Sequence, residues 1–281
     1  MTGRALLSST GLEQTAPASA GSLSRMLHVL ALFDEAQPYW SAASLIEALG
    51  TSRATGYRYI KTLYDAGLLT VVGNGYYSLG PRIIEMDLQI RLADPLLLAS
   101  QGVLEELVEK IGHSALLLTA FHDVSVVCIG ECRAPTSPAN RFSRGQRRPL
   151  FQGAGSKVIL AHLPHHRLKA IYARHAKDIG NAGLGTTWAD FRKILGQIKR
   201  DGYHLTRGDF NPGVYGVAAP ILSFQKTALG SIGVAWDEKE RSDVDVQGAV
   251  AAVRQAAQTV SQRLIQDPLP FSGRALPDHG G

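Results

Sequence analysis

The decisive stretch of the sequence is residues 51–67, TSRATGYRYIKTLYDAG. Thr51 or Ser52 can cap a helix at its start, and Gly67 can end it. The positions at helical spacing predict its buried side, namely Gly56, Tyr59, Ile60 and Leu63. The opposite side holds Arg, Thr, Tyr and Lys, with no Asp or Glu from residue 51 to residue 64. This balance of charge and size suits a helix that lies in the major groove of DNA.

The preceding segments predict two more helices. Ser41 can cap a helix that ends at Gly50, with an apolar stripe of Leu45, Ile46 and Leu49. Residues 22–35 have apolar positions at helical spacing, which are Leu23, Met26, Leu27, Leu30 and Phe33. The three helices would share one core.

The segment after Gly67 predicts a hairpin. Residues 68–72 and 76–79 are strand-like, and Gly73-Asn74-Gly75 between them is a strong signal for a short turn. Together these elements predict a winged helix-turn-helix domain over residues 22–80. Double-stranded DNA is therefore the first partner to consider.

Seven residues are candidates for DNA contact, namely Ser52, Arg53, Thr55, Tyr57, Arg58, Lys61 and Asn74. Arg53 and Arg58 can reach base edges or phosphates, and an arginine that pairs with guanine is worth about 1–3 kcal/mol of discrimination. Ser52 lies where helix N–H groups favour a phosphate, and Lys61 and Asn74 would position the duplex. The threonine and tyrosine could add apolar or phosphate contacts, although the tyrosine could instead be packed inside. An ordinary solvated helix face, or a winged helix that binds a protein, remains an alternative.

Length and composition place this domain in a larger soluble protein. The 281 residues suit two domains, with a net charge of +5 and a pI of about 9.2. No apolar run approaches the ~18 residues that cross a bilayer. Residues 1–21 lack the apolar core of a signal peptide and predict a disordered tail, as do residues 267–281. We expect a cytoplasmic protein with no membrane partner.

The two cysteines, Cys128 and Cys132, lie four residues apart with no second pair, which fits a reducing compartment. They could form a zinc site with His113 and His122, but partly buried strand cysteines are the favoured interpretation. No metal or cofactor is predicted.

The rest of the chain predicts a linker and a second domain. Gly80-Pro81 marks the domain edge, and residues 81–95 predict an amphipathic linker helix. Residues 96–266 predict a mixed α/β domain, in which one helix runs from Asp94-Pro95 to about Ile111 and strands follow at 114–121 and 124–131. A further helix is expected from Lys157. An arginine-rich run lies between Arg133 and Lys157. Its Arg144, Arg147 and Arg148 could help hold an acid, but a solvated loop is favoured.

Several motifs, in this order along the chain, resemble the IclR family of bacterial transcriptional regulators. In the first half they are Ser52-Arg53-Ala54-Thr55-Gly56-Tyr57-Arg58, Gly67-Leu68-Leu69 and Tyr76-Tyr77-Ser78-Leu79-Gly80-Pro81-Arg82. In the second half they are Arg148-Pro149-Leu150, Gly155, Lys157, Gly208-Asp209 and Gly216-Val217-Ala218-Ala219-Pro220-Ile221. The resemblance implies an α+β protein in which a linker helix joins the winged helix-turn-helix to a GAF- or profilin-like effector-binding domain. It also implies a homodimer or tetramer, a pseudo-palindromic operator and a small-molecule effector.

The resemblance also implies a ligand site. Its predicted residues are Gly153, Ala154, Gly155, Ser156, Thr206, Asp209, Gly216, Gly233 and Ala235. The turn at 153–156 exposes backbone N–H groups at a helix start, which suits a carboxylate. The small residues at 216, 233 and 235 predict room for a ligand larger and more apolar than pyruvate or glyoxylate, such as an aromatic carboxylate or its derivative.

The main alternative class is a hydrolase-like, small-molecule-binding enzyme with an accessory winged helix. Asp209, Ser156 and several histidines could support hydrolysis, but the Gly-x-Ser-x-Gly and His-Glu-x-x-His motifs are absent. A phosphate loop of the Gly-x-x-x-x-Gly-Lys-Ser/Thr order is absent as well. We therefore expect a ligand-responsive regulator, repressor or activator, of a catabolic operon, and no catalytic residues.

Overall fold

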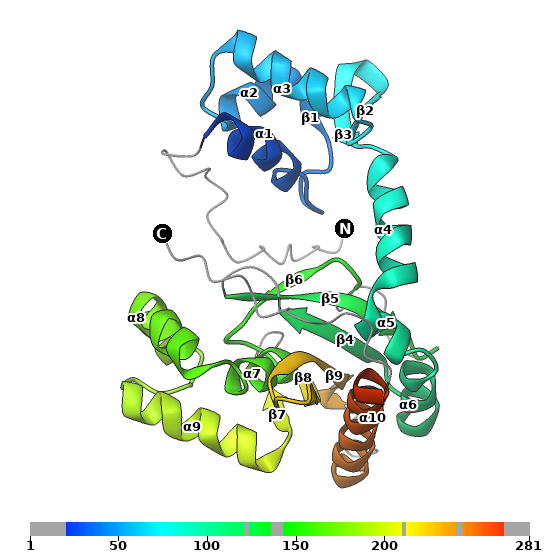
Figure 1. The fold of residues 1–281 in the computed structure, drawn as a ribbon, viewed down its shortest axis with the longest axis vertical. Helices are drawn as coiled ribbons and strands as arrows, with labels where there is room; N and C mark the ends of the chain where they lie inside the picture. The colour runs from blue at the N-terminus through cyan, green and yellow to red at the C-terminus, as the bar shows by residue number, and fades with distance from the viewer. Residues whose placement is uncertain (1–20, 121–123, 136–142, 210–211, 240–243, 267–281) are drawn as a thin grey trace. The chain divides into compact units, whose positions relative to one another are not determined.

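A computed structural model describes residues 21–120, 124–135, 143–209, 212–239 and 244–266 (Figure 1). The predicted tails, apart from Gly21, and the predicted turn at His122-Asp123 lie outside these residues, as does Arg141 of the arginine-rich run. The chain divides into two compact units, Met1–Leu92 and Ala93–Gly281.

The first unit contains three helices and a small antiparallel sheet. The helices are α1 (Ser22–Ala31), α2 (Ala42–Ala48) and α3 (Arg53–Asp65). The strands are β1 (Trp40–Ser41), β2 (Leu69–Val72) and β3 (Tyr76–Leu79), in the order β1-β3-β2. The two wing strands lie where the sequence predicts them. The two-residue β1, which pairs Trp40 with Tyr77, is too short to show a periodic pattern and was not predicted.

The core of this unit agrees with the prediction for α2 and α3 but not for all of α1. The predicted apolar residues of α2 and α3 are buried, and Ser41 caps α2 by accepting from the N–H of Ser44 (3.1 Å). In α1, however, Leu23 and Leu27 are 74% and 56% exposed. The helix is rotated so that Val29, with Leu32 just after its end, enters the core instead.

A linker helix and a pair of short helices follow. They are α4 (Arg82–Ala93), α5 (Pro95–Ala99) and α6 (Val103–Ile111). The prediction of one helix from Asp94-Pro95 to Ile111 is wrong, because the chain turns at Gly102, whose φ of +76° is not helical. Asp94 caps α5 through hydrogen bonds from the N–H groups of Leu96 (2.9 Å) and Leu97 (3.1 Å).

The second unit is built on a six-stranded antiparallel sheet in the order β6-β5-β4-β9-β8-β7. Its strands are β4 (Ala115–Ala120), β5 (Ser125–Cys132), β6 (Arg147–Pro149), β7 (His204–Arg207), β8 (Val214–Leu222) and β9 (Ala228–Asp237). Its later helices are α7 (Ala154–Ala161), α8 (His165–Asn181), α9 (Trp188–Asp201) and α10 (Val246–Gln266). The helix expected from Lys157 begins three residues earlier, at Ala154.

Helices cover both faces of this sheet (Figure 1). One face packs against α6 and α10, with Val217, Ile232 and Val234 in the shared core. The other face packs against α7, with Leu118, Val126 and Ala218 in a separate core that α9 extends. Successive residues of each strand therefore belong to different cores. In the part of the chain that the structure describes, no helix has the length and hydropathy to cross a bilayer.

Candidate functional site

The outer side of α3 presents the polar residues that the sequence singles out. Ser52 caps the helix, accepting from the N–H of Thr55 (3.3 Å) and donating to Thr55 Oγ1 (3.0 Å). Arg53 and Arg58 are exposed, and Tyr57 is 54% exposed, so the packed alternative for this tyrosine is wrong. The arrangement leaves two guanidinium groups and a phenol on one solvent-facing surface of a capped helix. Their contact with DNA stays a prediction.

The two other candidate DNA residues lie at the edges of this surface. Lys61 Nζ forms an exposed ion pair with Asp65 (2.8 Å), and this carboxylate raises the pKa of the lysine. Asn74 sits at the tip of the wing with φ of +64°, a conformation that asparagine tolerates better than most residues. Exposed ion pairs are weak, so a phosphate can compete with Asp65 for the lysine.

Gly56 of α3 sets the spacing between α3 and α2. A Cβ on Gly56 would overlap Ile46 Cγ1 of α2. Ile46 is 7% exposed and is held among core residues, so it has little room to move. Gly56 therefore lets α3 approach α2 closely and fixes the angle at which its outer side is presented.

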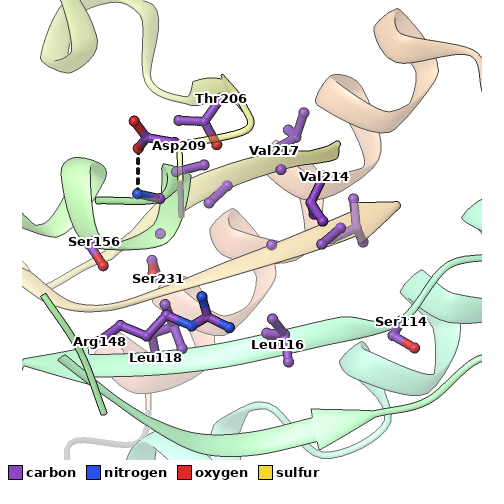
Figure 2. Close-up of a pocket in the computed structure, with 18 of the residues that line it drawn as sticks. Ser114, Leu116, Leu118, Arg148, Ser156, Thr206, Asp209, Val214, Val217 and Ser231 are labelled. Atoms are coloured by element: carbon purple, nitrogen blue, oxygen red, sulfur yellow. Dashed lines mark hydrogen bonds between the residues drawn. The ribbon is translucent and has the colours of Figure 1, made fainter. Parts of the chain in front are cut away.

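The second unit contains a pocket between α7 and the sheet (Figure 2). It holds about 1130 Å³ of space free of protein atoms, counted together with solvent at its mouth. All nine predicted ligand residues line it, and they come from the start of α7, from β7 and the segment after it, and from β8 and β9. The structure thus brings together residues up to 82 positions apart, from 153 to 235. Their role in binding stays a prediction.

The polar end of the pocket is partly occupied by the protein's own carboxylate. The N–H of Gly153 donates to Asp209 Oδ2 (2.5 Å), as the dashed line in Figure 2 shows. Asp209 also pairs with Lys157 (3.0 Å), whose side chain is only 7% exposed and also donates to the carbonyl of Ala182 (3.2 Å). The expectation that the N–H of Gly153 is open to a ligand is therefore wrong, because Asp209 already accepts from it.

Other donors at this end remain open among the described residues. The N–H groups of Ala154, Gly155 and Ser156, in the first turn of α7, have no protein acceptor there. Ser231 on β9 is 1% exposed, and its buried Oγ also lacks a protein partner. An ideal Cβ on Gly155 would lie 3.0 Å from this Oγ, which places the hydroxyl beside the helix start. A buried hydroxyl without a partner is costly, so a ligand oxygen would be stabilised here.

The three small residues of the predicted site, at 216, 233 and 235, differ in whether they leave free space in the pocket. A Cβ on Gly216 would meet Thr206 Oγ1 at 3.3 Å and Ala154 Cβ at 3.8 Å, which nearly fits. A Cβ on Gly233 would lie 2.5 Å from the carbonyl oxygen of Val217. Gly233 is therefore required by the close approach of neighbouring strands, and only 216 and 235 support the argument from volume.

Sequence reasoning missed several residues that line the pocket, among them Leu116, Leu118, Glu131, Arg133 and Ser231. Leu116 and Leu118 form an apolar wall on β4, two residues apart. The signal that could have found them is this strand alternation, which points every second side chain to one face. The sequence alone did not show which face would carry the pocket.

Arg148 corrects a second expectation. It lies on β6, lines the pocket and points into it in Figure 2, so the interpretation as a solvated loop is wrong for this residue. Burial lowers the pKa of Arg148 to about 10, which leaves the guanidinium charged at neutral pH. The neighbouring Arg147 is exposed. The pocket therefore has a cationic wall in addition to the start of α7.

The cysteines show no sign of a reactive or metal site. Both are free, and burial raises the pKa of Cys128 to about 12, so its thiol stays protonated and unreactive. Among the described residues, no group of three His, Cys, Asp or Glu side chains could hold a metal ion. His122 of the zinc alternative lies outside these residues.

The chain was compared with known protein families. Residues 22–73 match the IclR helix-turn-helix domain, and residues 94–262 match the bacterial transcriptional regulator IclR C-terminal domain. The chain belongs to the IclR family. It is thus a transcriptional regulator with a DNA-binding helix-turn-helix domain and an effector-binding domain, and not an enzyme. The predicted α+β fold class is confirmed.

Individual IclR-family relatives are distant but cover most of the chain. The regulator KipR of Bacillus subtilis is 23% identical, over 81% of this chain and 91% of its own. The regulator XynR of Escherichia coli is 24% identical, over 86% and 96%. An IclR regulator structure from Alicyclobacillus acidocaldarius has a TM-score of 0.72 at 22% identity, covering 86% and 98% of the two chains. An IclR homologue from Microbacterium hydrocarbonoxydans, complexed with 4-hydroxybenzoate, has a TM-score of 0.70 at 19% identity, covering 87% and 99%.

Proposed function

We propose that this regulator senses an aromatic carboxylate, or a derivative of one, in the pocket beneath α7. The observation that carries the proposal is the composition of the pocket, whose lining combines open helix N–H groups, the Ser231 hydroxyl and Arg148. Leu116 and Leu118 add an apolar wall. A carboxylate would accept from the donors, and a ring would lie against the leucines.

The available space favours a ligand larger than a two- or three-carbon acid. Small residues at 216 and 235 line the pocket and leave space beside the donors at the start of α7. The 4-hydroxybenzoate complex of the Microbacterium hydrocarbonoxydans homologue concerns that protein, and it motivates the choice of ligands to test here.

A thermal-shift series tests the ligand class. Benzoate and hydroxybenzoates should stabilise the protein, by about 2.7 kcal/mol at a concentration a hundredfold above Kd. Pyruvate and glyoxylate should stabilise it little. Stabilisation by the small acids alone would overturn the size argument. Arg148→Gln should weaken binding of the aromatic acids, whereas the matched variant of its exposed neighbour, Arg147→Gln, should not.

The proposal extends to assembly and operator. Five apolar side chains of α4 are between 43% and 73% exposed, namely Ile84, Met86, Leu88, Ile90 and Leu92. Of these, Ile84, Leu88 and Leu92 are spaced by four and form a row on one side of the helix, which favours packing against a second copy, as a homodimer or tetramer. A two-fold assembly would match a pseudo-palindromic operator. Sedimentation of the protein with and without Ile84→Glu and Leu88→Glu tests this, because a monomeric wild type would refute it.

The effector would act on DNA affinity through differential binding. A ligand changes the affinity for DNA only if it binds the free and DNA-bound proteins with different affinities, and the two effects are reciprocal. Retention of fragments from sheared genomic DNA would supply the operator. Ligand titration of the free protein and of the operator complex should then give different dissociation constants. Equal constants would refute effector control.

A further inference from the structure

We propose that helices α8 and α9 form a second DNA-contacting surface that binds the phosphate backbone without reading sequence. Residues 165–201, from the start of α8 to the end of α9, contain eight of the 29 Lys and Arg residues but only three of the 24 Asp and Glu residues. The rest of the chain therefore contains 21 of each sign. The whole net charge of +5 resides on this helix pair.

The cations of this pair point to solvent. Seven of them are exposed, namely Lys169, Arg174, Lys177, Arg192, Lys193, Lys199 and Arg200. Three histidines, at 165, 166 and 175, lie on the same helix as the first three cations. Ala170 and Ala173 lie between Lys169 and Arg174 in α8. Gly196 lies between Lys193 and Lys199 in α9. Small residues between the charges allow a broad anionic surface to approach.

In the part of the chain that the structure describes, none of these seven cations has a carboxylate oxygen within 4.0 Å. Six cations elsewhere are paired, in Lys61–Asp65, Arg82–Glu85, Arg91–Asp87, Arg133–Glu131, Lys157–Asp209 and Arg207–Glu238. The excess charge on α8 and α9 therefore produces a positive potential that is not offset locally.

The surface is carried by a rigid scaffold. Ile171 and Ile179 of α8, with Phe191 and Leu195 of α9, are buried in the core beside α7. The rings of Tyr172 and Trp188 lie 5.5 Å apart between the two helices. Figure 1 shows both helices on the opposite side of the sheet from α10. α9 is about 21 Å long, at 1.5 Å per residue, which is enough to lie along several phosphates, whereas α8 is kinked at His175, between Arg174 and Lys177.

DNA is the favoured occupant because the regulator already binds it through another domain. The regularly spaced phosphates of a duplex are opposite in sign to the charge that this surface carries. A surface of cations without carboxylate partners then adds affinity by releasing counterions, with no base contact required. An acidic protein is the other partner that this charge would fit.

Salt-dependent DNA binding by the full-length protein tests the proposal. The probe is long random-sequence duplex DNA, and the variant is Lys169→Gln with Arg174→Gln and Lys177→Gln. Each phosphate interaction that the variant removes should reduce the slope of log K against log salt by about 0.9. Lys193→Gln with Arg200→Gln on α9 should act in the same direction. Thermal unfolding should be unchanged, because these side chains are exposed.

The matched control removes three exposed cations from outside α8 and α9 in the same unit, through Lys110→Gln, Lys226→Gln and Lys239→Gln. A wild-type slope in the control and a smaller slope in the α8 variant would support the proposal. An equal reduction in both would mean that only total charge matters and would overturn it. A wild-type slope in the α8 and α9 variants would also overturn it, and would leave an acidic protein as the partner to seek.

Discussion

The recognition helix and the effector pocket are built in opposite ways. The outer side of α3 is one continuous segment whose long polar side chains point to solvent and whose backbone is held by a cap and a buried stripe. The pocket is assembled from segments between residues 113 and 236, and its working groups are largely backbone amides, small residues and buried side chains. Removing side chains should therefore weaken DNA binding by α3. In the pocket, enlarging a side chain should weaken ligand binding, and breaking an internal ion pair should lower stability.

The first prediction concerns the two arginines of α3. Arg53→Ala with Arg58→Ala should weaken operator binding by about 1–3 kcal/mol for each arginine that pairs with a base, so by roughly 30-fold to 20,000-fold in affinity if both do. Both side chains are exposed, so unfolding and effector binding should stay unchanged. Fluorescence anisotropy with the selected operator measures the effect.

The control for this prediction is Lys110→Ala with Lys239→Ala, which removes the same charge from the other unit. Wild-type operator affinity in the arginine variant would contradict the assignment of α3 as the recognition helix. A winged helix that binds a protein would then be the better interpretation of the first unit.

The second prediction concerns the ion pair at the polar end of the pocket. Asp209→Ala would leave Lys157, whose side chain is 7% exposed, without its carboxylate, and would remove the acceptor of the Gly153 N–H. Because Asp209 itself is 18% exposed, we expect a loss of about 2–3 kcal/mol, below the range for fully buried pairs. Denaturant unfolding measures it.

Exposed pairs provide the contrast for this experiment. Asp65→Ala removes the partner of Lys61, where both side chains are more than half exposed, and should change stability little. Equal losses in the two variants would show that the pair at Asp209 is no more important than a surface pair.

The difference between the two regions also explains what the sequence could predict. Helical periodicity is local, so the buried stripe of α3, including Tyr59 and Leu63, was found from residues 51–67 alone. The pocket depends on the register of distant strands, which decided that Leu118 and Ser231 share a wall. The family resemblance identified nine lining residues, but it did not reveal that Asp209 accepts from Gly153.

The two wrong predictions about helices, one after Asp94 and one in α1, also have local causes. The predicted continuous helix after Asp94 overlooked Gly102, whose positive φ is compatible with a turn between two short helices. In α1, Leu23 and Leu27 fit the helical spacing as well as Val29 does, and only packing against α3 selects between them. Periodicity predicts that a helix has an apolar side, but not how far that side extends.

The third prediction compares two glycines with opposite roles. Gly56→Val should cost about 1–3 kcal/mol and reduce DNA binding, because its side chain must displace Ile46 in a packed core. The exposed control on the same helix is Ala54→Val. Gly216→Ala meets its nearest neighbour, Thr206 Oγ1, at 3.3 Å, so that side chain must shift slightly, and the loss of stability should be smaller than in Gly56→Val.

Ligand binding separates the two glycine variants further. Gly216→Ala narrows the pocket, so the largest effectors should lose affinity while operator binding without ligand stays normal. Gly56→Val should leave effector affinity unchanged. Loss of stability in Gly216→Ala with no change in ligand selectivity would mean that this glycine serves packing, as Gly233 does.

The last prediction is the smallest and concerns acid stability of the second unit. Burial lowers the pKa of both His162 and His204, and the charge of Lys157 adds to the effect at His204. Below about pH 6.5 the unfolded chain binds protons at these histidines that the folded chain binds only at lower pH. The free energy of unfolding should therefore be highest above pH 6.5 and fall as the pH drops below it.

Fluorescence of the variant Trp40→Phe can measure this decline. In this variant the remaining tryptophans, Trp188 and Trp236, both lie in the second unit, so denaturant titrations at several pH values report the unfolding of that unit alone. His162→Gln with His204→Gln should flatten the dependence even if it lowers stability overall, since the proton uptake that drives the decline is then absent. An unflattened profile would assign the acid sensitivity to other groups.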